Sequence, residues 1–157
     1  MAAAGGVLAA MFMSLAVTGK MDVTMAINGA IAGLVSITAD PLSPSAGTAV
    51  IVGAIGGAIV YFSIVFLEKA GVDDPVGAIS AHGTVGIYGV LVVALTGGAS
   101  FMGQLTGVVM IAAFTYLASL GTIYVINMVM PIRASDAEQE AGLDISEVGI
   151  EAYPEFK

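Results

Sequence analysis

The sequence predicts an all-α integral membrane protein with five transmembrane helices and a polar C-terminal tail. The first observation behind this prediction is composition: 58% of the 157 residues are hydrophobic and only 10% are charged, whereas about a quarter of the residues in a soluble domain are charged. The second is that the apolar residues form five runs with short polar breaks between them. The third is that most acidic residues lie in the last part of the chain, after residue 133.

The five apolar runs predict helices at about 2–19, 23–39, 48–67, 75–97 and 106–130. A helix needs about 20 residues to cross the hydrocarbon core of a bilayer. The last three runs reach this length easily, and the first two are short. We therefore expect a transmembrane region at 1–133 and an acidic cytoplasmic tail at 134–157.

The basic residues predict the orientation of these helices. If five helices alternate in direction, all four Lys and Arg residues fall on one side of the membrane: Lys20, Lys69, Arg133 and Lys157. Loops on the cytoplasmic side carry an excess of Lys and Arg. We therefore expect a multi-pass protein of the cell membrane with its C-terminus in the cytoplasm, although coincidence is the alternative explanation.

Glycine spacing predicts close packing between the helices. Small residues let membrane helices approach one another closely. The candidates form two GxxxG pairs and one triplet with a spacing of three: Gly29 and Gly33, Gly53 and Gly57, and Gly83, Gly86 and Gly89. The alternative is that glycine is simply common in membrane helices.

His82 is the only histidine in the sequence, and it lies inside an apolar run. Asp74 and Pro75 predict the start of this helix, with Asp74 as the N-cap. His82 follows about 11 Å further along at helical rise, and an ionisable group at such depth suggests a function. Because no anion accompanies it in the span, we expect a neutral imidazole. A structural histidine bonded to a backbone carbonyl of a neighbouring helix is the alternative, and the composition leaves both open.

Several other classes of function have little support. The sequence has no cysteine, so disulfides and thiolate metal sites are excluded. It has no basic patch, so nucleic acid is not an expected partner. A single histidine without a partner that completes a nucleophile–base pair or a metal set argues against an intramembrane enzyme. We expect no cofactor, no metal and no catalytic residue.

The stretch DDPVGAISAHGTVGIYG, residues 73–89, resembles the tenth transmembrane helix of the ammonium transporter family. That family has the approximate pattern DDPxxxxxxHGxxGxxG. Other segments resemble the family in the same order along the chain, namely 2–11 (seventh helix), 28–39 (eighth helix), 51–75 (ninth helix and following loop) and 142–153 (tail signature). The resemblance therefore covers essentially the whole chain.

This resemblance implies the fold and function of the last five helices of an eleven-helix ammonium transporter. Such proteins are trimers in which ammonium loses a proton and ammonia crosses a narrow apolar pore past two histidines. His82 matches the second histidine of that pair, and Ala78, one turn earlier, is expected to line the pore. The first histidine, the aromatic gate and the outer recruitment site belong to earlier helices, so we expect the chain to be the C-terminal part of a transporter.

The resemblance also implies a docked tail on the cytoplasmic face, where PII-type regulatory proteins bind some family members. The expected docking residues match the family's tail signature: Gly142, Leu143, Asp144 and Tyr153. We expect Gly142 to adopt a positive φ. The sequence departs from the signature at Val148, where a histidine is usual, and at Ile150, where an acidic residue is frequent.

Two functional hypotheses follow. In the first, the chain is the part of an ammonium transporter that contributes the second pore histidine. In the second, it is a truncated, non-conducting module that assembles with or regulates a complete transporter. Uptake of a labelled ammonium analogue by this chain alone distinguishes them.

Overall fold

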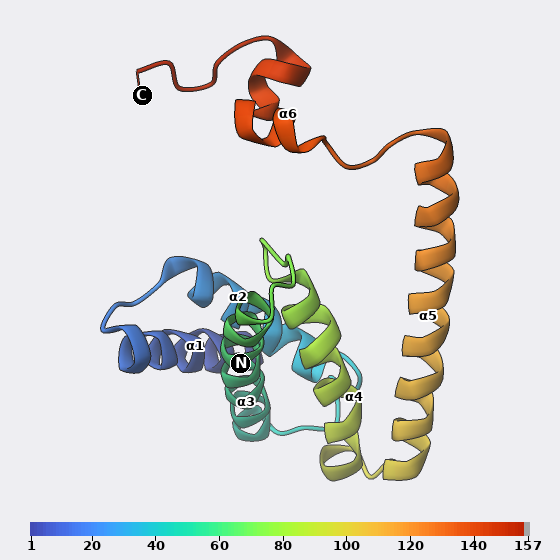
Figure 1. Ribbon diagram of the computed structural model, residues 1–157. Coiled ribbons are helices and arrows are strands. Elements are labelled where there is room, and N and C mark those ends of the chain that lie inside the picture. The colour runs from blue at the N-terminus through green and yellow to red at the C-terminus, as the bar shows by residue number, and fades with distance from the viewer. Residues whose placement is uncertain (156–157) are drawn as a thin grey trace. The chain divides into compact units, whose positions relative to one another are not determined.

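The computed structural model describes residues 1–155, which form helices and no strand (Figure 1). In chain order the helices are α1 (Ala2–Thr18), α2 (Val23–Ile37), α3 (Ala46–Lys69), the π-helical η1 (Ile79–Thr84), α4 (Val85–Thr96), α5 (Phe101–Val129), α6 (Asp136–Ala141) and the π-helical η2 (Asp144–Val148). The chain divides into two units, Met1–Met110 and Ile111–Lys157, and α5 runs from the first into the second.

The first unit is a bundle in which α1 packs against α2 and α3, and α2 also contacts α3, η1 and α4. Its hydrophobic core joins small and branched side chains of four of these segments, Ala32 of α2 and Val60 of α3 with Ala81 of η1 and Val85 of α4. Ala32, Val60 and Val85 are fully buried. The core therefore holds η1 and the start of α4 against α2 and α3.

Glycines allow the backbone of α1 to come into direct contact with the backbones of α2 and α3. A Cβ atom added at Gly29 or Gly57 would overlap the carbonyl oxygen of Gly6, and one added at Gly33 or Gly53 would overlap that of Ala2. Gly6 itself faces the Gly29 carbonyl in the same way. Both GxxxG pairs of the sequence analysis thus lie against α1, where any side chain would push the helices apart.

The glycine triplet of the fourth helix has a close neighbour within this chain at one of its three positions. Gly89 lies against α2, since an added Cβ would come within 2.8 Å of the Val35 carbonyl oxygen. At Gly83 and Gly86 the nearest atom to an added Cβ is 3.9 Å away, which is ordinary contact distance. Among the described residues no other helix approaches Gly83 or Gly86 at backbone distance, and close packing at these two positions stays a prediction.

Helix ends follow capping side chains more than they follow hydropathy. The Ser45 hydroxyl accepts the Thr48 N–H, and α3 starts at Ala46. The Ser100 hydroxyl accepts the Gly103 N–H in the same pattern, so α5 starts at Phe101 rather than near 106. Both hydroxyls satisfy N–H groups that have no partner in the first turn of a helix.

The expected start of the fourth helix at Pro75 is also wrong. Gly77 has a φ of +71°, which interrupts the right-handed helix, and regular helical structure is established only from Ile79. A glycine adopts this conformation without the steric penalty that other residues meet. Residues 70–77 therefore form a longer loop than the sequence predicted.

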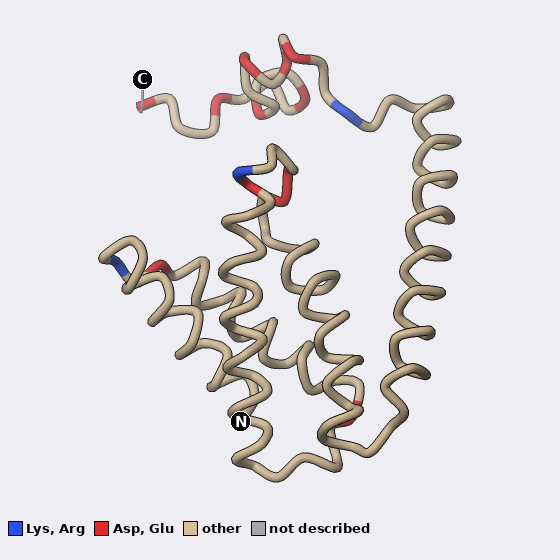
Figure 2. The backbone as a smooth tube through the Cα atoms, turned by 60° about the horizontal axis from the view of Figure 1, so that its bottom comes forward, with Lys and Arg blue, Asp and Glu red and all other residues tan. Residues whose placement is uncertain are grey.

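Three helical stretches are long and apolar enough to cross a membrane, namely Ala46–Lys69, Ile79–Thr96 and Phe101–Val129. The apolar helices α1 and α2 are shorter than this length. Figure 2 shows that charges are sparse along the apolar helices and that acidic residues gather in the last segment of the chain. In the second unit, no described residue of α5 is buried.

Candidate functional site

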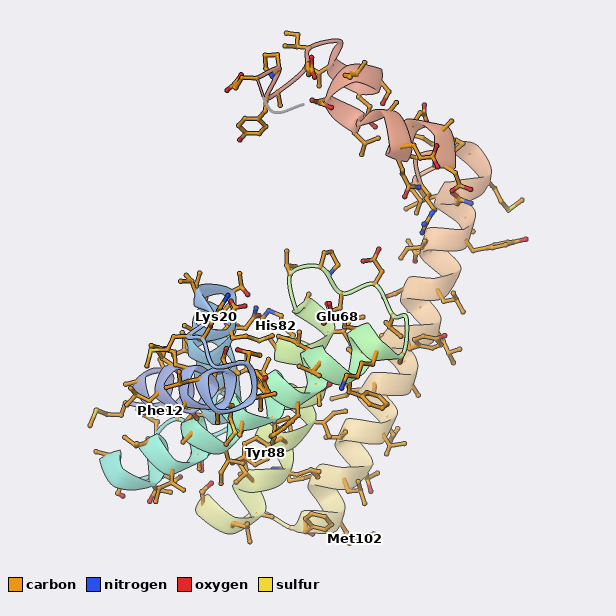
Figure 3. All side chains as sticks on the ribbon, turned by 60° about the vertical axis from the view of Figure 1, so that its left-hand side comes forward. Phe12, Lys20, Glu68, His82, Tyr88 and Met102 are labelled. Atoms are coloured by element: carbon orange, nitrogen blue, oxygen red, sulfur yellow. The ribbon has the colours of Figure 1, made fainter. Side chains whose placement is uncertain are left out.

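The candidate site is the wide helical turn that carries His82. Figure 3 labels His82 on η1 and Tyr88 further along on α4. The N–H of Val85 donates to the carbonyl of Ser80, five residues earlier, as well as to that of His82. A π-helical turn of this kind is rare and occurs frequently at functional sites.

One face of this turn is packed and the other is open. Ser80 and Ala81 are buried, whereas Ala78 and His82 are exposed on the surface of the chain. Residues four apart lie on the same side of a helix, so Ala78 and His82 share the exposed face. The His82 imidazole forms no hydrogen bond with another residue of the described chain. It is thus available to a molecule or a helix outside this chain.

The carboxylate of Asp74 holds the beginning of the turn. It accepts the N–H of Ile79 at 3.0 Å and the N–H of Ser80 at 3.1 Å. Partial burial opposes the charged form of Asp74, but these N–H groups outweigh it, and the pKa of Asp74 lies below its ordinary value. Asp74 therefore caps the helix across the Gly77 loop, from a greater distance along the chain than the sequence predicted.

A polar cavity of about 580 Å³ lies at the same end of the first unit. Its walls come from the start of α2 and from the end of α3 with the loop that follows, and they include Asp22, Thr24, Glu68, Asp73 and Asp74. The Asp22 carboxylate caps α2, and its bonds from the Thr24 hydroxyl and from the N–H groups of Met25 and Thr24 lower its pKa. The start of α2, just after Lys20, and the end of α3 at Lys69 thus meet at one end of the unit.

The sequence analysis missed a set of hydroxyl groups behind His82. The Ser63 hydroxyl of α3 donates to Ser80 Oγ at 3.0 Å and shares a second hydrogen bond with Thr84 Oγ1, also at 3.0 Å. The sequence does show that Ser63, Ser80 and Thr84 lie inside apolar spans, where a hydroxyl group needs a hydrogen-bond partner. Because Ser63 is 17 and 21 residues away from its two partners, the sequence alone did not predict these contacts.

The tail of the second unit folds on itself around Asp144. Gly142 ends α6 with a φ of +96°, so the expected positive φ is confirmed. The Asp144 carboxylate accepts the Ala152 N–H at 2.7 Å, and this bond lowers the pKa of Asp144. Leu143 precedes the η2 turn, and Tyr153 follows Ala152 with a largely exposed side chain. Lys157 lies outside the described residues.

The chemistry open to His82 is limited. Within residues 1–155, no three His, Cys, Asp or Glu side chains gather closely enough to hold a metal ion. A neutral imidazole donates one hydrogen bond and accepts another.

Comparisons with known proteins agree with these features. The sequence model of the Ammonium Transporter Family matches residues 1–153. The chain is 33% identical to ammonium transporter Amt2 of Archaeoglobus fulgidus and 34% identical to ammonium transporter Amt2 of Methanocaldococcus jannaschii, with 99% of this chain aligned in both cases. Its structure resembles a solved Sensor Amt Protein with a TM-score of 0.76 and 30% identity over 93% of this chain.

The chain is much shorter than these proteins. It spans 38% of the length of each of the two Amt2 relatives and 39% of the solved Sensor Amt Protein chain. The similarity therefore concerns one contiguous part of those proteins.

Proposed function

Because this chain belongs to the Ammonium Transporter Family, we propose that it supplies the part of an ammonium-conducting pore that carries the second pore histidine, His82. The observation that supports this proposal most directly is the exposed face of η1. His82 and Ala78 lie on it together, while the opposite face is packed against α2 and α3. A pore-lining helix needs one open face of this kind.

In the proposed mechanism, ammonium gives up its proton before it enters the apolar part of the pore. Moving a full charge into hydrocarbon without a counter-charge costs many kcal/mol, whereas a neutral molecule needs only hydrogen-bond partners. Ammonia both donates and accepts hydrogen bonds, and so does the neutral imidazole of His82. Ala78 leaves room beside it, and the paired histidine comes from a helix outside this chain.

The test uses a chimera in which this chain replaces the matching part of the Archaeoglobus fulgidus Amt2 relative. We expect His82→Ala to change methylammonium uptake per molecule far more than it changes the amount of folded protein. Ile87→Ala, at another exposed position of the same helical stretch, is the matched control. If His82→Ala lowered only the amount of protein, His82 would have a structural role.

We also propose the orientation and assembly that the family suggests. Lys20, just before α2, and Lys69, at the end of α3, face the cytoplasm together with the acidic tail. The complete protein is a homotrimer in the cell membrane, and a PII-type regulatory protein docks on the cytoplasmic tail. Crosslinking of the chimera in membranes, with and without a PII-type protein, tests both interactions.

A second candidate function is that of a non-conducting module that assembles with or regulates a complete transporter. The similarity to a protein named Sensor Amt Protein is the observation that supports it. We expect this chain alone to show no methylammonium uptake, because one wall of the pore is absent from it. A change in the uptake of a co-expressed complete transporter would favour the second candidate.

A further inference from the structure

Ser63 joins α3 to the turn that carries His82. Within the apolar helices, the bonds from Ser63 to Ser80 and to Thr84 are the side chain–side chain hydrogen bonds that connect two different helices. The buried serines Ser14 and Ser36 bond to backbone groups instead. Ser80 is fully buried, so its hydroxyl depends on a partner inside the protein.

The two partners of Ser63 lie on either side of His82 in sequence. Ser80 and Thr84 are four residues apart and share one side of the helix, whereas His82, two residues from each, points the other way. The bonds of Ser63 therefore span the wide turn from behind. The Ser80 carbonyl opens this turn by accepting the Val85 N–H, so a shift of Ser80 or Thr84 would rotate His82.

We propose that Ser63 is a positioning residue, which holds the π-helical turn through Ser80 and Thr84 and thereby fixes the direction of the His82 imidazole. The importance of this direction for transport rests on the function proposed above. The geometric claim stands on the hydroxyl groups alone.

The experiment uses the complete chain in lipid bilayers with ¹⁵N-labelled histidine. Because His82 is the only histidine, its two ring nitrogens give the only imidazole signals in the nitrogen NMR spectrum. We expect Ser63→Ala to displace or broaden both signals, and Ser63→Thr, which keeps the hydroxyl, to restore them. Ser36→Ala removes a buried hydroxyl that bonds within its own helix, and we expect it to leave the signals in place.

Unchanged His82 signals in folded Ser63→Ala would overturn the proposal, and so would an equal displacement in Ser36→Ala. If Ser63→Ala does not fold, Thr84→Val removes one of the two bonds at an exposed position. A smaller displacement of the His82 signals in Thr84→Val supports the proposal. Unchanged His82 signals in that variant overturn it.

A transport measurement separates this proposal from the proposed function. In the chimera we expect Ser63→Ala to lower methylammonium uptake about threefold, as for the loss of one average interhelical hydrogen bond in a membrane, with recovery in Ser63→Thr. If His82→Ala leaves uptake unchanged, the proposed function fails, and the NMR result still decides whether Ser63 positions the imidazole.

Discussion

At Gly57, an added Cβ would overlap the Gly6 carbonyl and come within 2.8 Å of the Gly6 Cα. These are backbone atoms, which cannot turn aside as a flexible side chain would. We expect Gly57→Ala to force α1 and α3 apart and to lower the free energy of unfolding by about 1–3 kcal/mol. Thermal unfolding in detergent, followed by circular dichroism, measures the change.

The matched control for Gly57 is Gly121→Ala in α5, where nothing lies within 4 Å of the added Cβ. There the change removes a poor helix former and is expected to be neutral or slightly stabilising. Equal melting temperatures for both variants would show that Gly57 is not a packing residue.

Gly142 tests a different property of glycine, its backbone conformation. Its φ of +96° disfavours any other residue, and an added Cβ would lie 2.6 Å from the Asp144 carboxylate. We expect Gly142→Asp to destabilise the folded tail by about 1 kcal/mol or more. If the tail docks as proposed, methylammonium uptake in the chimera falls about fivefold.

The control for Gly142 is Ala141→Asp, which adds the same charge one residue earlier, inside α6. We expect it to retain more uptake than Gly142→Asp. Full uptake both in Gly142→Asp and in a chain that ends after Arg133 would show a passive tail.

Among the helical elements, η1 depends on a carboxylate outside its own sequence. Because the Asp74 pKa is lowered in the folded protein, its stabilising effect is complete above the ordinary aspartate pKa. The effect is lost as pH falls through the lower folded value. We expect Asp74→Ala to speed amide hydrogen exchange at Ile79 and Ser80 about fivefold at neutral pH, as for the loss of an N-cap worth about 1 kcal/mol.

Hydrogen exchange followed by NMR measures this effect of Asp74. Asp73→Ala removes a neighbouring carboxylate that accepts no N–H from η1 in the described chain, and we expect it to leave both amides protected. Equal exchange in the two variants would contradict the capping role of Asp74.

The element boundaries show what hydropathy predicts and what it does not. Apolar runs located the five apolar helices, because burial in lipid or protein requires them. Hydropathy missed the ends at Ala46, Phe101 and Ile79, since these depend on a capping hydroxyl or on the backbone of Gly77. The role proposed for His82 came from a motif, whereas its hydroxyl support by Ser63 required the three-dimensional contact between α3 and η1.

For the molecule as a whole, the first unit shows how much of a helical bundle this chain specifies by itself. The packing of α1, α2 and α3 is internal to the chain, because their glycines face one another's backbones. The exposed face with Ala78 and His82 has no such complement among the described residues. Sequence spacing predicted the glycine packing, whereas no pattern within this chain predicts what covers the exposed face with His82.

The orientation of the whole molecule in the membrane gives the last prediction. The chain has no cysteine, so each introduced cysteine is the sole target of a membrane-impermeant thiol reagent. Leu42 lies in the loop between α2 and α3, and its side chain is 92% exposed. Ile145 lies in the tail, and its side chain is also exposed. In intact cells that express the chimera, we expect the reagent to label Leu42→Cys and not Ile145→Cys.

Opening the cells should make Ile145→Cys reactive, which controls for a cysteine that is merely unreactive. The physical reason for this orientation is the placement of the basic residues. Lys20 lies between α1 and α2, Lys69 is the last residue of α3, and Arg133 precedes the tail. Because loops on the cytoplasmic side carry an excess of Lys and Arg, we expect all three on that side. Labelling of Ile145→Cys from outside intact cells would reverse the orientation, and the acidic tail would then be out of reach of any cytoplasmic regulator.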